Sequence, residues 1–92
     1  METTKLAILP ISFVVDGVPC TLWETLKVSP LGGEPHFICV VSINYLGVES
    51  KRWSIPAKDM KDLINKLKVE ITKLKIIEYE KGVDAVRRIL TR

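Results

Sequence analysis

The sequence contains few of the residues that build catalytic or metal sites. Its 92 residues include one histidine, His36, and two cysteines, Cys20 and Cys39. No CxxC pair, Cys/His cluster, GxSxG nucleophile elbow or GxxxxGK[ST] phosphate loop is present. We therefore expect a protein that is not an enzyme and that needs no metal and no cofactor. The two cysteines are expected to be buried free thiols, with a disulfide between neighbouring strands as the alternative.

The sequence also lacks a long apolar segment. No run reaches the roughly 18 residues that a membrane-spanning helix needs, and no signal peptide or targeting tail is recognisable. We expect a cytoplasmic protein that neither enters a membrane nor acts on a small-molecule substrate. The abundance of lysine, isoleucine and glutamate is typical of proteins from thermophiles.

Positive charge is scarce in the first part of the chain. Residues 1–56 contain four Lys or Arg and five Asp or Glu. Residues 57–92 contain ten Lys or Arg and six Asp or Glu. The overall net charge of +3 is mild. This balance permits an anionic partner without requiring one.

The hydrophobic pattern predicts four strands in the first part of the chain. β-Branched and aromatic residues alternate with polar ones, and turn signals separate the segments. Pro10, inside the first segment, indicates an edge strand or a bulge. The expected strands cover residues 6–15, 20–28, 36–46 and 51–55.

From Ala57 onward the apolar residues recur every three or four positions, which predicts a long helix. Pro56 suits the first helical turn, Gly82 marks the end, and a short helix is expected over Val83–Thr91. The chain is thus expected to form one α+β domain over residues 1–92, mainly β over 1–56 and helical over 57–92. Its antiparallel four-stranded sheet would pack against the long C-terminal helix, with a short terminal helix added.

The long helix carries more apolar residues than one packing face needs. Val69, Ile76 and Tyr79 lie off the main apolar stripe, and part of the stripe steps 4-3-4-3, as in a short zipper. We expect a homo-oligomer, a dimer or tetramer, with a monomer built around an unusually apolar core helix as the alternative. The expected oligomerisation residues are Met60, Ile64, Leu67, Val69, Ile71, Leu74 and Ile76.

Aromatic and basic residues alternate on two of the predicted strands. In the second strand, alternation places Trp23 with Lys27 and two threonines on one face and mostly apolar residues on the other. The stretch SKRWSIP adds two cations and a second tryptophan. Rings that stack on bases, beside cations that contact phosphates, are what binding of an unpaired nucleic acid strand requires. The expected nucleic-acid-binding residues are Trp23, Lys27, Phe37, Tyr45, Lys51, Arg52 and Trp53.

The expected partner is single-stranded DNA, with RNA as the alternative, bound with little sequence preference. Other readings remain open. One alternative is that Trp23 is covered by a loop or a neighbouring subunit. Another is a non-enzymatic interaction module in which the exposed aromatic residues form a protein–protein interface, where tryptophan and arginine are enriched. A transcription regulator acting on duplex DNA is a further alternative.

The order of four strands and a long helix, with a basic strand running into "WSIP" and then "MKDLINKL", resembles two groups of single-stranded DNA-binding proteins. The first is the archaeal ThermoDBP-type group, in which an aromatic, basic binding domain is joined to oligomerisation elements. The second, more weakly similar, is the p15-type coactivators, which are related in architecture to the whirly proteins. The resemblance covers roughly residues 20–75.

This resemblance implies an archaeal oligomer that binds single-stranded DNA. It would match Lys51, Arg52 and Trp53 to the basic strand before the helix, and Trp23 and Lys27 to a neighbouring strand. In the coactivators the C-terminal helix builds the dimer and the sheet binds the DNA. The chain departs from that pattern in its lower density of basic residues and in its almost wholly apolar opening strand.

Overall fold

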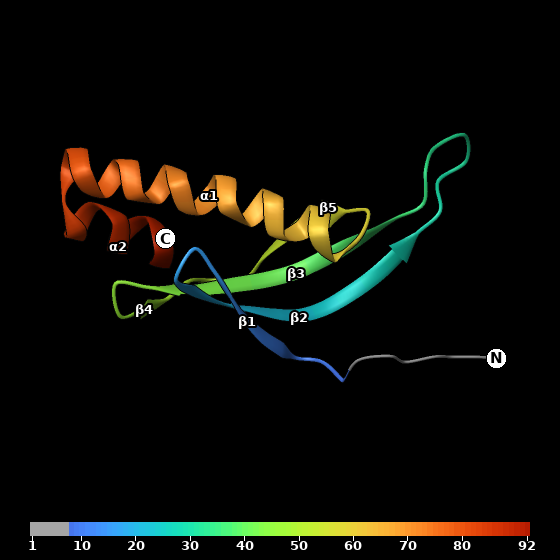
Figure 1. Cartoon of the computed structure of the whole chain (residues 1–92), viewed down its shortest axis with the longest axis horizontal. Helices are drawn as coiled ribbons and strands as arrows, with labels where there is room; N and C mark the ends of the chain where they lie inside the picture. The colour runs from blue at the N-terminus through green and yellow to red at the C-terminus, as the bar shows by residue number, and fades with distance from the viewer. Residues whose placement is uncertain (1–7) are drawn as a thin grey trace.

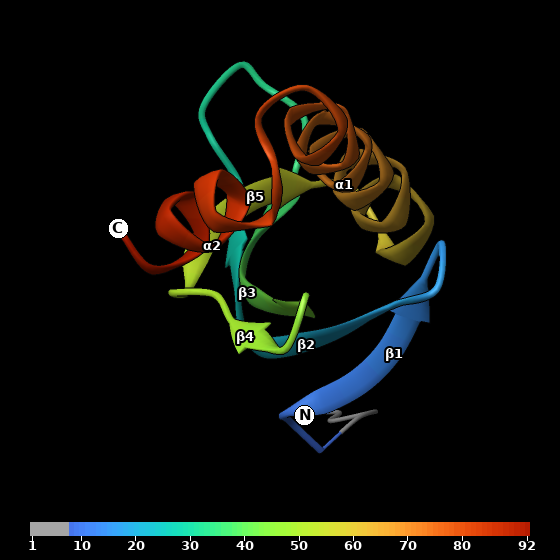
Figure 2. The same cartoon turned by 90° about the vertical axis from the view of Figure 1, so that its left-hand side faces the viewer.

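A curved antiparallel sheet with two helices on its concave side forms the structure of this protein, a computed structural model that describes residues 8–92 (Figures 1 and 2). This arrangement confirms the predicted α+β class. In chain order the elements are β1 (Ile11–Val15), β2 (Val18–Val28), β3 (His36–Tyr45), β4 (Val48–Glu49), β5 (Trp53–Ala57), α1 (Met60–Lys81) and α2 (Val83–Thr91).

Strand β3 lies at the centre of the sheet. It pairs with β2 along one side, and β1 continues the sheet beyond β2 as an edge strand. Along its other side β3 pairs first with β5 and then, at Asn44 and Tyr45, with the short strand β4. The sheet therefore has five strands, where the sequence predicted four. The fifth, β4, arises because the chain reverses at Leu46 and Gly47 and pairs at once with the end of β3.

Strand β2 contains an irregularity that exchanges its two faces. Leu22 lies opposite Val41, but Glu24 lies opposite Val40, so Trp23 is an extra residue between them. Beyond this bulge Lys27 lies opposite Phe37 and thus on the side of the helices. The prediction that Trp23, Thr25 and Lys27 share one face is therefore wrong, because it assumed unbroken alternation.

The hydrophobic core lies between the concave face of the sheet and the two helices. Both cysteines are buried there as free thiols, which confirms that expectation, and burial raises the pKa of Cys20 to about 11. The buried apolar residues are Val15, Val18, Cys20, Leu22, Cys39, Val41, Ile43, Ile55, Ala57, Leu63, Leu67, Ile71, Leu74, Val86 and Leu90.

Helix α1 begins three residues later than predicted. Asp59 is its N-cap, and one carboxylate oxygen of Asp59 accepts a hydrogen bond from the backbone N–H of Asp62 at 2.8 Å. Pro56 lies in β5, opposite Ile38, and not in the helix. An edge strand tolerates proline, because the missing N–H faces away from the paired strand. Gly82 ends α1, and α2 occupies the predicted residues.

The main apolar stripe of α1 packs on the sheet of the same chain. Leu67, Ile71 and Leu74, which were predicted to mediate oligomerisation, are buried in this core, so that prediction is wrong for them. Ile64 is half-buried against the same core, whereas Met60, Val69 and Ile76 are exposed. Apolar residues with 4-3-4-3 spacing occur both in helices that pack on a sheet and in helices that pair with a second helix. The spacing alone therefore does not distinguish a core helix from an oligomerisation helix.

The molecule is elongated, with principal extents of 49 × 29 × 22 Å. The β2–β3 hairpin reaches beyond the start of α1 and ends in the loop of residues 29–35 (Figure 1). The first predicted strand began at residue 6, and its residues 6 and 7 lie outside the described part of the chain. Neither α1 nor α2 combines the length and the apolarity that crossing a membrane requires.

Candidate functional site

The residues predicted to bind nucleic acid do not share one surface. Phe37, Tyr45 and Trp53 belong to the concave side and pack against the core beneath the helices. The Tyr45 hydroxyl donates a hydrogen bond of 2.5 Å to a carboxylate oxygen of Glu78 in α1, and this bond raises the pKa of Tyr45 to about 12. None of these three rings is placed on the open side of the sheet. Their assignment to one binding surface is therefore wrong.

Two predicted lysines are exposed but separated from the remaining tryptophan. Lys27 lies beyond the bulge, on the helix side near the tip of the hairpin. Lys51 precedes β5, and its backbone N–H donates to the carbonyl of Leu90 in α2 at 3.1 Å. The basic strand expected over residues 51–55 is thus anchored at its first residue by the terminal helix, and regular pairing begins only at Trp53.

Trp23 and Arg52 are the two predicted residues that do come together. They lie on the convex side of the sheet, called here the open face because it is turned away from both helices. The Arg52 guanidinium carbon is 3.7 Å from the centroid of the Trp23 ring. The indole Nε1–H donates to the Ser42 hydroxyl at 2.9 Å, and that hydroxyl donates to a carboxylate oxygen of Glu49 at 2.7 Å.

This network makes Trp23 a poor stacking platform. One face of its ring is covered by Arg52, its N–H group has a partner, and the side chain is half-buried. The group presented to solvent is the guanidinium of Arg52, and Glu24 and Glu49 lie on the same face. The open face therefore carries one cation and two carboxylates and does not concentrate positive charge for phosphates.

The far half of the open face is aliphatic. Leu26 lies opposite Ile38, Ile38 lies opposite Pro56, and Val40 occupies the neighbouring row of β3. Leu26 is 65% exposed. We call this surface the distal patch, which consists of Leu26, Val28, Ile38, Val40 and Pro56.

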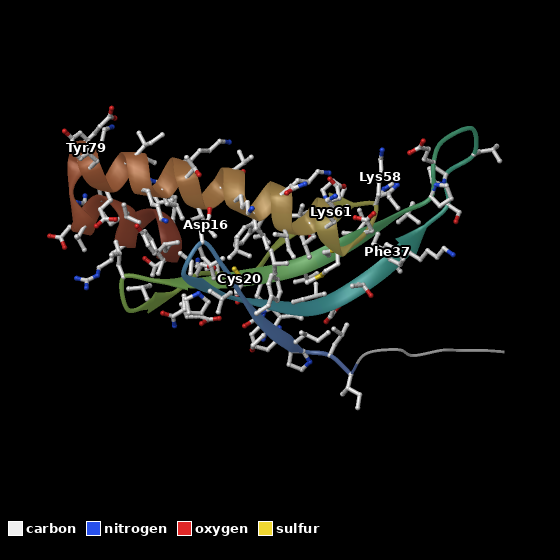
Figure 3. The ribbon with its side chains drawn as sticks, in the orientation of Figure 1. Asp16, Cys20, Phe37, Lys58, Lys61 and Tyr79 are labelled. Atoms are coloured by element: carbon white, nitrogen blue, oxygen red, sulfur yellow. The ribbon has the colours of Figure 1, made fainter. Side chains whose placement is uncertain are left out.

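A concentrated positive surface lies instead on α1. Three lysines, Lys61, Lys68 and Lys75, are spaced by seven residues, so an ideal helix places them within about 40° of one another around its axis. Asn65, Thr72 and Tyr79 fall on the same side. We call these six residues the lysine flank. All six are exposed, and Tyr79 is 91% exposed. Lys61 and Tyr79, near the two ends of α1, are labelled in Figure 3.

The carboxylates of α1 lie outside this flank. Asp62 pairs with Lys66 at 3.4 Å and Glu70 pairs with Lys73 at 3.5 Å, on the opposite flank of the helix. None of the ion pairs found among residues 8–92 involves a lysine of the flank. Lys75 donates a long hydrogen bond, 3.4 Å, to the backbone carbonyl of Asp16 in the β1–β2 turn.

The lysine flank was missed at the level of sequence although its signal is present there. Counting charge over residues 57–92 gives only a modest excess of lysine and arginine, because acids on the other flank offset the lysines. The seven-residue spacing of Lys61, Lys68 and Lys75, plotted around a helix, would have separated the two flanks.

A hollow of about 250 Å³ lies beside the start of α1, between β5 and the hairpin loop. Its charged groups already have partners. Lys58 lies 3.4 Å from Glu34, and the ammonium of Lys66 donates to the carbonyl of Pro56 at 2.6 Å. His36 lies within 3.2 Å of the carbonyl of Glu34. Among residues 8–92, no group of three His, Cys, Asp or Glu side chains is arranged to hold a metal ion.

Comparisons with protein-family models, with curated proteins and with solved structures found no match for this chain.

Proposed function

We propose that this protein binds single-stranded nucleic acid, DNA or RNA, without strong sequence preference, and that the lysine flank of α1 is the contact surface. The observation that carries the proposal is the separation of charge on α1. Three of its six lysines share a side on which the helix has no carboxylate, while its four acids lie elsewhere. A strand laid along this side meets attraction without repulsion from α1.

The geometry of the flank suits an extended polyanion. From Lys61 to Lys75 the helix rises about 21 Å at 1.5 Å per residue, a length over which an extended strand carries several phosphates. Ammonium groups on flexible stems contact phosphates as point charges and read no bases. Asn65 and Thr72, which lie between the lysines, add hydrogen-bonding groups that any nucleotide can use.

Tyr79 favours an unpaired strand over a duplex. Its ring is 91% exposed, one helical turn beyond Lys75, and hydrogen-bonds with no described residue. An unpaired base stacks on such a ring with a gain of about 1–3 kcal/mol, whereas a duplex keeps its bases stacked on each other. The proposal thus keeps the predicted chemistry, cations beside an aromatic ring, and moves it from the sheet to the helix.

The direct test compares two triple variants that remove the same charge from the same helix. Lys61→Gln, Lys68→Gln and Lys75→Gln together remove the flank, while Lys66→Gln, Lys73→Gln and Lys81→Gln form the matched control. Binding of a labelled oligo-dT and of its RNA equivalent is followed by fluorescence anisotropy, and circular dichroism checks that both variants are folded.

The flank variant should lose at least about tenfold in affinity, while the control should stay within about twofold of the wild type, since only the flank lysines contact phosphates. For three phosphate contacts, the wild type should show log K falling with log salt with a slope of about −2. Equal losses in the two variants would contradict the proposal, because they would indicate only a general effect of net charge. Tighter binding of a duplex of the same length would contradict the assignment to single strands.

A further inference from the structure

We infer that the outer side of α1 is a docking surface for an acidic amphipathic helix of another protein. A row of exposed side chains runs along this side, in which Val69, Ile76 and Tyr79 are 54%, 51% and 91% exposed. No described element covers the row, because α1 packs on the sheet with its opposite side (Figure 2). We call the row the outer seam, which consists of Asn65, Val69, Thr72, Ile76 and Tyr79.

The outer seam has the spacing by which one helix contacts another. Its residues follow one another in steps of 4-3-4-3, as the contact positions of a two-stranded coiled coil do. The seam is a second such row in α1, distinct from the apolar stripe on the sheet, and is about 21 Å long at 1.5 Å per residue. Because α1 is already ordered by its packing on the sheet, only the incoming helix loses conformational freedom when it binds.

The charges beside the seam indicate the chemistry of the partner. In a helix pair, the residues that flank the contact positions face those of the other helix, and their charges set partner choice. A helix with glutamate or aspartate at its flanking positions meets opposite charge on both sides of the seam. The six flanking residues of the seam are five lysines and one glutamate: Lys61, Lys68 and Lys75 on one side, and Lys66, Lys73 and Glu80 on the other.

The two flanking rows differ in the charge that they leave unpaired. Lys66 and Lys73 each pair with a carboxylate of α1, at 3.4 Å and 3.5 Å. None of the ion pairs found among residues 8–92 involves the row of Lys61, Lys68 and Lys75. This row therefore contributes most of the attraction for an acidic helix.

The same charges oppose a second copy of this chain as the occupant. In a parallel pair of α1 helices, Lys68 of one copy faces Lys73 of the other, and in an antiparallel pair each row faces the same row of the other copy. Like charges placed this close repel. Val69 and Ile76, which the sequence predicted to mediate homo-oligomerisation, are therefore better matched by a helix of opposite charge.

The inference stands independently of the proposed function. It depends on Val69 and Ile76, which take no part in phosphate contact, and on lysines from both sides of the seam. A helix seated on the seam also covers Lys68 and Lys75 of the lysine flank. Such a helix and a nucleic acid strand on the flank therefore exclude each other.

The test uses a synthetic peptide as the probe. The labelled peptide of about three heptads has leucine and isoleucine at its contact positions and glutamate at its flanking positions. Binding to the native protein is followed by fluorescence anisotropy with no nucleic acid present. One control peptide has the same composition in scrambled order, and another has lysine in place of glutamate. The acidic amphipathic peptide should bind at least about tenfold more tightly than either control.

Variants of the seam separate docking from a general attraction between charges. Val69→Ser with Ile76→Ser removes the aliphatic contacts, keeps every lysine and should weaken peptide binding at least about tenfold. Val14→Ser with Leu31→Ser, at exposed aliphatic residues outside α1, is the matched control and should bind the peptide as the wild type does. Circular dichroism checks that both variants are folded.

Three outcomes would overturn the inference. They are the absence of binding, equal binding of the amphipathic and scrambled acidic peptides, and an unchanged affinity in Val69→Ser with Ile76→Ser. Because no nucleic acid is present and the lysines are intact in both variants, failure here leaves the proposed function untouched.

Discussion

The guanidinium of Arg52 lies over the indole of Trp23, with its central carbon 3.7 Å from the ring centroid. The two residues are far apart in the chain and meet because β3 pairs with β2 on one side and with β5 on the other, and the Trp23 ring reaches Ser42 of β3. Both were predicted to contact nucleic acid. Their contact with each other instead makes them a structural pair on the open face.

Removal of Arg52 should expose the Trp23 ring without unfolding the protein. Arg52→Ala should lower the free energy of unfolding by about 0.5–1 kcal/mol, the usual contribution of a cation–π pair at an exposed site. Tryptophan emission should shift to longer wavelength because one face of the ring becomes hydrated. Lys51→Ala is the neighbouring control and should change neither urea unfolding nor the emission maximum; equal effects in both variants would indicate that the pair contributes nothing.

Ser42 should matter more than its small side chain indicates. Ser42 is 1% exposed, and its hydroxyl accepts a hydrogen bond from Trp23 and donates one to Glu49. Ser42→Ala removes the partner of both groups and should cost about 0.5–1.5 kcal/mol of stability, the usual net contribution of a hydrogen bond, because Trp23 is half-buried and Glu49 is exposed and water can reach both. Ser54→Ala, at an exposed position of the same face, should change the urea midpoint very little, and a comparable loss there would refute the importance of the network.

The hydrogen bond between Tyr45 and Glu78 predicts a loss of stability at high pH. The bond raises the pKa of Tyr45 from 10.0 to about 12 in the folded protein, so its contribution is fully present below pH 10 and is lost as the pH rises toward 12. In Tyr45→Phe the urea midpoint should depend less on pH across that window. Tyr79→Phe is the control for a second tyrosine, and an unchanged pH profile in Tyr45→Phe would disprove the assignment.

Leu67 should behave as a core residue and not as an interface residue. It is fully buried against the sheet of its own chain. Leu67→Ala should lower the free energy of unfolding by about 2–5 kcal/mol at every protein concentration, because a cavity forms inside one subunit. Val69→Ala, two positions away on the outer side, should have little effect. A destabilisation by Leu67→Ala that disappears as the protein is diluted would place Leu67 in an interface after all.

Much of the fold was predictable because it is encoded in short-range patterns. Runs of β-branched and aromatic residues between turn signals identified four of the five strands, β1, β2, β3 and β5, and the three-to-four spacing identified α1. Gly82 and the nine residues after it were located correctly, since a glycine that ends one helix leaves a clear signal for the next. The errors at Pro56 and at β4 arose where strand pairing, rather than local preference, decides the conformation.

The candidate site was predicted less well because it depends on which face each side chain takes. Trp23 and Lys27 are four residues apart, so regular alternation predicts that they lie on the same face of the sheet. The extra residue at the bulge shifts the register, and the two side chains lie on opposite faces. Trp53 and Tyr45 were assigned to the open surface, but the helices return over their side of the sheet. The three flank lysines were visible in the sequence, and their importance emerged only once the opposite side of α1 was found to be buried.

The sequence by itself determined the type and order of every element except β4, the end of α1 and the lack of recognisable catalytic motifs, because these depend on neighbouring residues. The tertiary structure decided which side of the sheet the aromatic rings of the strands occupy. It also decided that the zipper-like apolar stripe of α1 packs on the sheet of the same chain. Each of these depends on what packs against a face, and residues distant in the chain supply that contact.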